Sequence, residues 1–323
     1  MRRSAALSKF FSLAANHGRA LRSNDLSPRR RGAARSQAVQ DWLARSGPSL
    51  HRVLRALKLA WLMFTVVLKR RLAYRGDLLI QALDELLRGL VAFALLQVYV
   101  SKSQDLAGWN RDQLLFVLGF SLVPISFFHC LCGNLYQLSS RYIINGELDR
   151  ILLRPYPSYL QICFDRLAIE DLSGAVFGFT LMAIAAARLP GFDWSPLNLG
   201  LLALMLASAF GVVVAVFMAF ASTGFWFEDR VGMVPPVYNL MEFGRWPVDI
   251  YHRLVRLLIT CAIPFGFVAF FPASLFVGGR AGDVASPWWQ HPGVWTPVVA
   301  AVALVVAMSL WRLGIRRYNS AGN

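Results

Sequence analysis

The sequence predicts an all-α, polytopic membrane protein with six transmembrane helices. Of its 323 residues, 56% are hydrophobic and only 16% are charged, whereas about a quarter of the residues of a soluble domain are charged. A helix that crosses the hydrocarbon core of a bilayer needs roughly 20 apolar residues. Runs of this kind follow one another at roughly Leu78–Val100, Leu114–Leu138, Ala168–Ala187, Leu197–Phe220, Leu254–Val277 and Val294–Leu313.

The positive charge is concentrated ahead of the first apolar run. The chain has a net charge of +15, and more than half of its Lys and Arg residues precede Asp77, with only Asp25 and Asp41 as acids among them. A basic segment ahead of membrane helices fits a cytosolic anchor that faces anionic lipid. No motif of an RNA- or DNA-binding protein accompanies it, so nucleic acid is not an expected partner.

Two segments precede the membrane helices. Residues 1–50 are rich in Arg, Ser and Ala and poor in acids. We expect a basic, disordered cytosolic extension there, although an organellar transit peptide has the same composition. Leu50–Tyr74 mixes basic with apolar residues, and its apolar centre, Leu59–Leu68, is too short to span a bilayer. It predicts an interfacial helix that leads into a membrane domain at residues 51–323.

Lys and Arg in the short loops predict that both termini lie in the cytosol, because cytoplasmic loops carry an excess of these residues. With that orientation, the inner loops and the carboxyl end hold Arg141, Arg150, Arg154, Arg166, Arg230, Arg245, Arg253, Arg256, Arg312, Arg316 and Arg317. The outer loops hold only Lys102, Arg111, Arg188 and Arg280.

The first span carries three charged residues, Asp84, Glu85 and Arg88. Asp84 and Arg88 are spaced to form an ion pair on one helix face, which lowers the cost of bringing charge toward the membrane. The pair either faces a substrate path or marks the place where the helix leaves the inner interface. We favour the second interpretation.

The later spans are interrupted. Pro124 should kink the second span, and Pro264 and Pro272 should kink the fifth. The segment before it, Phe225–Arg253, is less apolar, and Trp246-Pro247 breaks any continuous helix there. We expect this segment to lie on the membrane surface or to be half inserted.

The polar stretch Asn145–Pro155 predicts an amphipathic helix that lies on the membrane surface. Its first residue, Asn145, can cap a helix, and its final proline ends one. Leu148, Ile151 and Leu152 share one face at helical spacing and form an apolar stripe. By pattern alone, such a helix more often rests on lipid headgroups than binds a partner.

No motif predicts chemistry on this chain. All four cysteines lie in or beside apolar runs, and Cys130 and Cys132 would point to different sides of a helix, so no metal site is expected. The zinc-binding HExxH motif and the nucleophile motif GxSxG do not occur. No lysine follows a glycine, which excludes the phosphate-binding P-loop. We therefore expect no catalytic residue and no cofactor on this chain.

Several stretches, taken in order, resemble the permease subunits of ABC-2-type ATP-binding-cassette exporters. The resemblance is strongest to the bacterial branch whose permeases work beside a separate ATPase chain, and it runs from Leu72 to the carboxyl end. Its landmarks are Ala73–Asp77, Ile144–Asp149, Leu152–Pro155, Phe243–Pro247, Ile263–Phe267, Phe271–Ala273 and Leu310–Gly322.

This resemblance implies a coupling helix in the cytosolic loop after the second span, which binds in a cleft of the ATPase. The coupling residues that it implies are Gly146, Glu147, Leu148, Asp149, Arg150 and Arg154. It also implies that Leu50–Tyr74 is an elbow helix at the membrane surface. A second permease, the same chain or a related one, would complete the pathway, and ATP would be bound and hydrolysed on the partner ATPase.

Together with the patterns above, this resemblance implies a multi-pass exporter subunit of a bacterial inner (plasma) membrane, in contact with lipid, and the apolar spans suit a hydrophobic or amphipathic substrate. Two other classes stay open. An ion-coupled secondary transporter would need acids near the bilayer midplane, whereas the acids here cluster at the ends of spans. The other class is a membrane scaffold or an intramembrane enzyme. An enzyme would need several polar residues that converge inside the spans, and Ser126 with His129 alone is weak evidence for such a site.

Overall fold

The computed structural model describes Thr65, Lys69 and residues 75–102, 108–154, 157–227, 233–278 and 288–319. The elements in this part of the chain are helical, in agreement with the predicted all-α class. The predicted extension, residues 1–50, lies outside the described residues. So does the predicted elbow helix, apart from Thr65 and Lys69, which are both helical.

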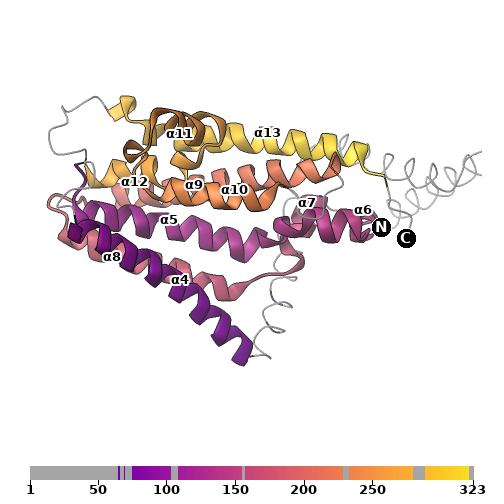
Figure 1. Cartoon of the computed structure of the whole chain (residues 1–323), viewed down its shortest axis with the longest axis horizontal. Coiled ribbons are helices and arrows are strands. Elements are labelled where there is room, and N and C mark those ends of the chain that lie inside the picture. Colours follow the sequence, from indigo (N-terminus) through magenta and orange to yellow (C-terminus); the bar gives the residue numbers. More distant parts are fainter. Residues whose placement is uncertain are drawn as a thin grey trace, which may run out of the picture.

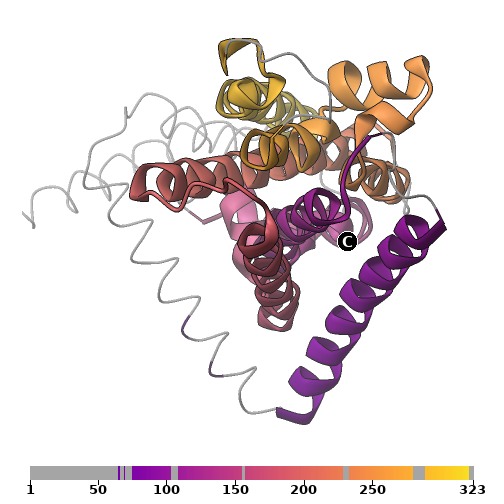
Figure 2. The same ribbon diagram turned by 90° about the vertical axis from the view of Figure 1, so that its left-hand side faces the viewer.

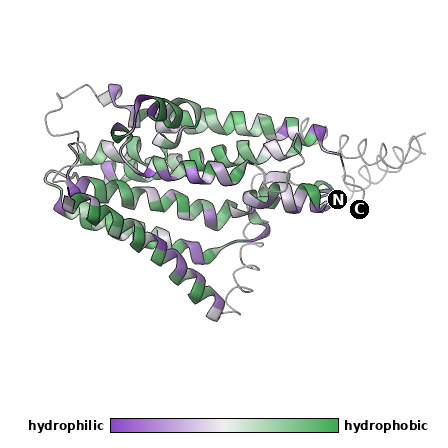
Figure 3. Ribbon diagram, in the orientation of Figure 1, coloured by the Kyte–Doolittle hydropathy of each residue, from purple (hydrophilic) through white to green (hydrophobic). Residues whose placement is uncertain are grey.

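Four long helical stretches form the body of the structure (Figure 1). They are built on α5 (Arg111–Cys132) with its continuation through η1 (Gly133–Gln137) and η2 (Leu138–Ile144), on α8 (Leu172–Arg188), on α9 (Pro196–Ser222) and on α13 (Thr296–Arg317). The stretches long and apolar enough to cross a membrane are Arg111–Ile144, Ile169–Arg188, Pro196–Phe225 and Pro292–Arg317. They match the second, third, fourth and sixth predicted spans, and Figure 3 shows mainly hydrophobic residues along them.

The two ends of this bundle differ. The first, here called the α6 end, holds α6 (Glu147–Leu152), α7 (Ser158–Asp165) and the last turn of α13. The second, here called the Trp109 end, holds the start of α5, where Trp109 packs on Phe270 with 5.2 Å between the ring centroids. Trp194 and Trp295 are exposed at the same end, before α9 and α13. Tryptophan is enriched at membrane–water interfaces.

α4 (Arg75–Lys102), the first predicted span, packs against α8 at the edge of the bundle (Figure 2). A Cβ atom at Gly89 would lie 2.8 Å from the Phe177 ring, so glycine lets the two helices approach. The predicted ion pair forms, with 2.6 Å between Arg88 Nη2 and Asp84 Oδ2. α4 is 28 residues long but does not reach the apolarity of the four spans, so its crossing of the membrane stays a prediction.

The fifth predicted span, Leu254–Val277, is broken rather than merely kinked. It consists of two helical stretches, Arg253–Ala262 and Phe265–Val277, that meet at 73° on either side of Pro264. The first contains α11 (Arg253–Leu257) and η7 (Leu258–Ala262), and the second contains α12 (Phe270–Val277). Gln113 at the start of α5 donates a hydrogen bond to the Val277 carbonyl at 3.0 Å, which places α12 at the Trp109 end.

The chain returns toward the Trp109 end through α10 (Val234–Met241) and η5 (Glu242–Arg245). Tyr238 packs on Tyr136 of η1, with 5.8 Å between ring centroids, whereas Trp246 packs on Tyr99 near the end of α4 at the same distance. The inward side chains of α10 are buried against α9. One face of α10 therefore packs into the bundle, while Pro235, Pro236 and Asn239 stay exposed. The position of this segment on the membrane surface, or half inserted, stays a prediction.

Three of the arginines that were counted to predict the orientation lie on this part of the chain. Arg245, Arg253 and Arg256 were assigned to the loops at the α6 end. Arg245 ends η5, and the other two lie on α11, beside Phe271 of α12. The side of the membrane that these arginines face stays a prediction.

A close contact between α5 and α8 tests how the bundle packs. In α5, a Cβ atom at Gly119 would lie 2.7 Å from the carbonyl oxygen of Gly178 in α8, whereas at Gly211 in α9 its closest contact, 3.5 Å, is ordinary. Alanine gains about 1 kcal/mol of helix propensity at either position. We expect Gly211→Ala to raise the thermal unfolding temperature in detergent. Gly119→Ala should lower it, because overpacking costs about 1–3 kcal/mol. Equal shifts would contradict the α5–α8 contact.

Candidate functional site

A sharp turn joins the end of α5 to α6. The α5 rod ends in the π-helix η2, and the amide of Gly146 donates to the carbonyl of Ile143 at 3.2 Å. Gly146 has φ +72°, a left-handed conformation that glycine adopts without steric cost. It occupies the cap position of α6, so the prediction that Asn145 caps the helix is wrong. The turn lets α6 fold back against the end of the α5 rod.

α6 presents two different faces. Leu148 and Ile151, two residues of the predicted apolar stripe, are buried, with 0% and 7% of their surface exposed. Arg150 and Arg154 are exposed on the opposite side, and the Leu153 side chain between them is 79% exposed. The buried stripe holds the helix to the bundle, while the outer face combines two cations with one large apolar side chain.

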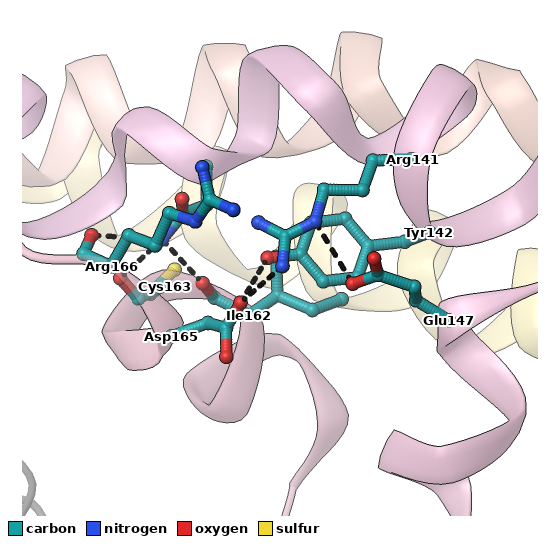
Figure 4. Close-up of polar contacts among 8 residues, drawn as sticks. Arg141, Tyr142, Glu147, Ile162, Cys163, Asp165 and Arg166 are labelled. Carbon is teal, nitrogen blue, oxygen red and sulfur yellow. Dashed lines mark hydrogen bonds and ion pairs between the residues drawn. The ribbon is translucent and has the colours of Figure 1, made fainter. Parts of the chain in front are cut away.

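An ion network centred on Arg141 fastens α6 to η2 and α7 (Figure 4). Arg141 Nε lies 2.9 Å from the Glu147 carboxylate, and Arg141 Nη2 lies 3.1 Å from the Asp165 carboxylate. The Tyr142 hydroxyl donates to the same Asp165 oxygen at 2.9 Å. One guanidinium therefore joins three helical elements, and Glu147 points inward to this network rather than toward a partner.

Side-chain amides fix α7 beneath the same turn. Gln161 Nε2 donates to the Ile151 carbonyl at the end of α6 at 3.2 Å, and this carbonyl also accepts from the amide of Arg154. Asn134 Nδ2, from η1, donates to the carbonyls of Ile162 and Arg166, both at 2.9 Å. Through these bonds, α7 links α6 to the α5 rod by a second route.

The end of α13 contacts the same site. Trp311 Nε1 donates to Ser158 Oγ at the start of α7, at 3.1 Å. Burial, together with the nearby Asp149 carboxylate, raises the pKa of Tyr318, so this phenol stays protonated at neutral pH. α6 is therefore held by the α5 rod, by α7 and by the end of α13.

The six predicted coupling residues differ in what they contact. Gly146 forms the turn, Leu148 is buried and Glu147 pairs with Arg141, whereas Asp149 faces Tyr318. Only Arg150 and Arg154 face outward. The residues that sequence reasoning missed are the fasteners Asn134, Arg141, Tyr142, Gln161 and Asp165. Arg141 did have a signal, because a cation six residues before Glu147 can pair across a turn.

Nothing in this geometry predicts bond-making chemistry. The described residues contain no group of three or more His, Cys, Asp or Glu side chains placed to hold a metal ion. The arrangement is a rigid helical element with one outward face.

Comparison with known proteins gives one match. The family described as ABC-2 family transporter protein matches residues 86–322, from the middle of α4 to beyond α13. No curated protein and no solved structure matches the chain.

Proposed function

Because the chain belongs to the ABC-2 family of transporter proteins, we propose that it is the permease subunit of an exporter driven by a separate ABC ATPase. The family makes the chain a membrane component of an ABC transporter. The observation that carries the finer proposal is the fastening of α6. It is buried on one side, held by three helical elements, and exposes Arg150, Leu153 and Arg154 on the other side.

We propose that this outer face binds in a cleft of the ATPase. Leu153 supplies a large apolar side chain, and the two arginines suit an acidic rim. When ATP binding closes the ATPase pair, α6 moves with it. The Arg141 network then passes the movement to η2 and α7 rather than letting α6 move alone.

The orientation proposed is cytosolic for the α6 end. Cations gather there at Arg141, Arg150, Arg154, Arg166, Arg312, Arg316 and Arg317, as expected for a cytoplasmic face. The Trp109 end, with its exposed tryptophans, is then the outer interface. In this orientation the carboxyl end lies in the cytosol, and the membrane is the plasma membrane of a bacterium.

A second permease, a copy of this chain or a related one, is proposed to pack on α4. This helix exposes large apolar side chains, among them Leu79, Leu83 and Leu87. Its ion pair between Asp84 and Arg88 is also more than half exposed. An ion pair in contact with lipid tails is unfavourable, so a protein partner or a polar path suits this face better. The cargo that such a path would export is proposed to be amphipathic.

Co-purification with the cognate ATPase tests the proposed coupling. The double variant Leu153→Asp/Arg154→Ala should abolish capture of the ATPase, because it places an acid where an apolar side chain binds and removes one cation. The matched control is Leu197→Asp, an equally exposed leucine at the Trp109 end, which should leave capture unchanged. Normal ATPase capture by the double variant would refute the role of α6, provided that the variant still elutes as a folded protein.

A further inference from the structure

A groove of about 570 Å³ lies at the Trp109 end, beside α11 and η7. η6 (Val248–Ile250) forms one side, and Phe271 of α12 contributes to its wall. Its volume is within the range of pockets that bind small ligands. The coupling role of α6, at the opposite end of the bundle, makes no use of it.

The groove carries one excess positive charge. Arg256 donates to the carbonyls of Val248 and Asp249 at 3.2 and 3.1 Å, and it lies 3.7 Å from the Asp249 carboxylate, which balances its charge. Arg253 lines the same groove with an exposed guanidinium. The groove thus has two guanidinium groups, of which Arg256 is held by the backbone and Arg253 is exposed, and only one carboxylate. This excess of positive charge favours an anionic ligand, and phosphate oxygens suit guanidinium donors especially well.

A polar side chain in the wall has no partner of its own. The Thr260 hydroxyl is buried and makes no hydrogen bond within the part of the chain that the structure describes. A threonine on a helix normally bonds to a carbonyl of the preceding turn, and a buried hydroxyl without a partner is unfavourable. A small shift of this π-helical turn would let a ligand oxygen satisfy it.

The remaining surface is apolar. Leu257 and Phe271 line the groove, and Leu254, on the adjacent face of α11, is 72% exposed. Cations beside an exposed apolar face are typical of a helix that lies in a membrane interface and contacts lipid. The groove therefore joins a cationic part to an apolar part.

We propose that this groove binds the phosphate-bearing headgroup of an amphiphile at the outer interface. Arg253 and Arg256 bind the phosphate, Thr260 bonds to a headgroup oxygen, and the chain of the amphiphile lies along Leu257 and Leu254. The ligand is either a resident membrane phospholipid or the cargo on its way out. The proposal requires that the Trp109 end lie at a membrane interface, but it does not require coupling through α6.

Cys261 offers a direct reporter, because it lines the groove and is exposed, whereas the other three cysteines are buried. The full chain is reconstituted in nanodiscs of an uncharged, phosphate-free galactolipid, with or without phosphatidylglycerol, and modified with N-ethylmaleimide. We expect phosphatidylglycerol to slow modification of Cys261 about tenfold, which corresponds to about nine grooves in ten being occupied. Arg253→Gln should restore the faster rate, and Arg253→Lys should keep part of the protection.

Two controls isolate the groove. Leu197→Cys in a Cys261→Ser background reports how surface charge alone changes thiol reactivity at the same end of the bundle. Arg188→Gln removes an exposed cation outside the groove, and it should leave the protection of Cys261 unchanged. Equal slowing at Leu197→Cys, or slow modification of Cys261 without phosphatidylglycerol, would overturn the proposal. The second result would indicate that protein covers the groove.

Soluble phosphate compounds that compete for the groove test whether the ligand must be an amphiphile. Inorganic phosphate or glycerol phosphate should protect Cys261 weakly, because neither contacts the apolar wall. Protection by inorganic phosphate equal to that by phosphatidylglycerol would contradict an amphiphile as the ligand. If removing the ATPase or adding nucleotide changes the protection, the ligand is cargo; if it does not, the ligand is a resident lipid.

Discussion

In intact cells, a membrane-impermeant maleimide should modify Cys261 without permeabilisation. Cys261 lies in η7, which the structure places with the broken helix pair at the Trp109 end, and it is the exposed cysteine of the four. We propose that this end faces outward. Long exposure to the reagent is needed, because an amphiphile in the groove slows the reaction without preventing it. The measurement is the mass shift of the purified protein.

A second cysteine, placed at the end of the bundle that we propose to be cytosolic, serves as the control for Cys261. Leu153→Cys, combined with Cys261→Ser, exposes a thiol on α6 at the opposite end of the bundle. It should react with the impermeant reagent only after permeabilisation. If both thiols react from the same side, the bundle does not separate the two ends as the structure indicates. If only the Leu153→Cys thiol reacts in intact cells, the ends are assigned in reverse.

This experiment addresses the part of the fold that the sequence predicts least well. Long apolar runs predicted α5, α8, α9 and α13, because each of these stretches is long and apolar enough to cross a membrane in one piece. α10 and η5 are short, and tertiary contacts such as Tyr238 on Tyr136 hold one face of α10 against the bundle. Residues 254–277 have the composition of a span, but Pro264 breaks them into a bent pair at one end. The hydropathy of a segment indicates that it is buried from water, but it does not indicate how deep in a membrane the segment lies.

The candidate site, too, was predicted from the sequence only in part. The spacing of Leu148 and Ile151 predicted the buried face of α6, because helical periodicity is a local property. The outward position of Arg150 follows from the same spacing. The pairing of Glu147 with Arg141, and of Arg141 with Asp165, depends on how a π-helix, a glycine turn and α7 come together. No local pattern contains that information, so the ion pair of Glu147 with Arg141 could not be predicted, and a coupling role for Glu147 stays a prediction.

Arg141→Ala should separate binding of the ATPase from transmission of its movement. The guanidinium is about 20% exposed and contacts two carboxylates. Its loss leaves Glu147 and Asp165 close together without a cation, which costs about 1–3 kcal/mol of local stability. Amide hydrogen exchange in α6 should therefore accelerate. The outer face with Arg150, Leu153 and Arg154 is untouched, so the ATPase should still co-purify.

The decisive measurement is the response to nucleotide. In the unmodified complex, a non-hydrolysable ATP analogue should change hydrogen exchange in α6 and also in η2 and α7, because Arg141 joins these elements. In Arg141→Ala the change should be confined to α6. The matched control is Arg317→Ala, which removes an exposed cation at the same end. A nucleotide response that still reaches η2 and α7 in Arg141→Ala would mean that Gln161 and the buried stripe carry the movement without the ion network.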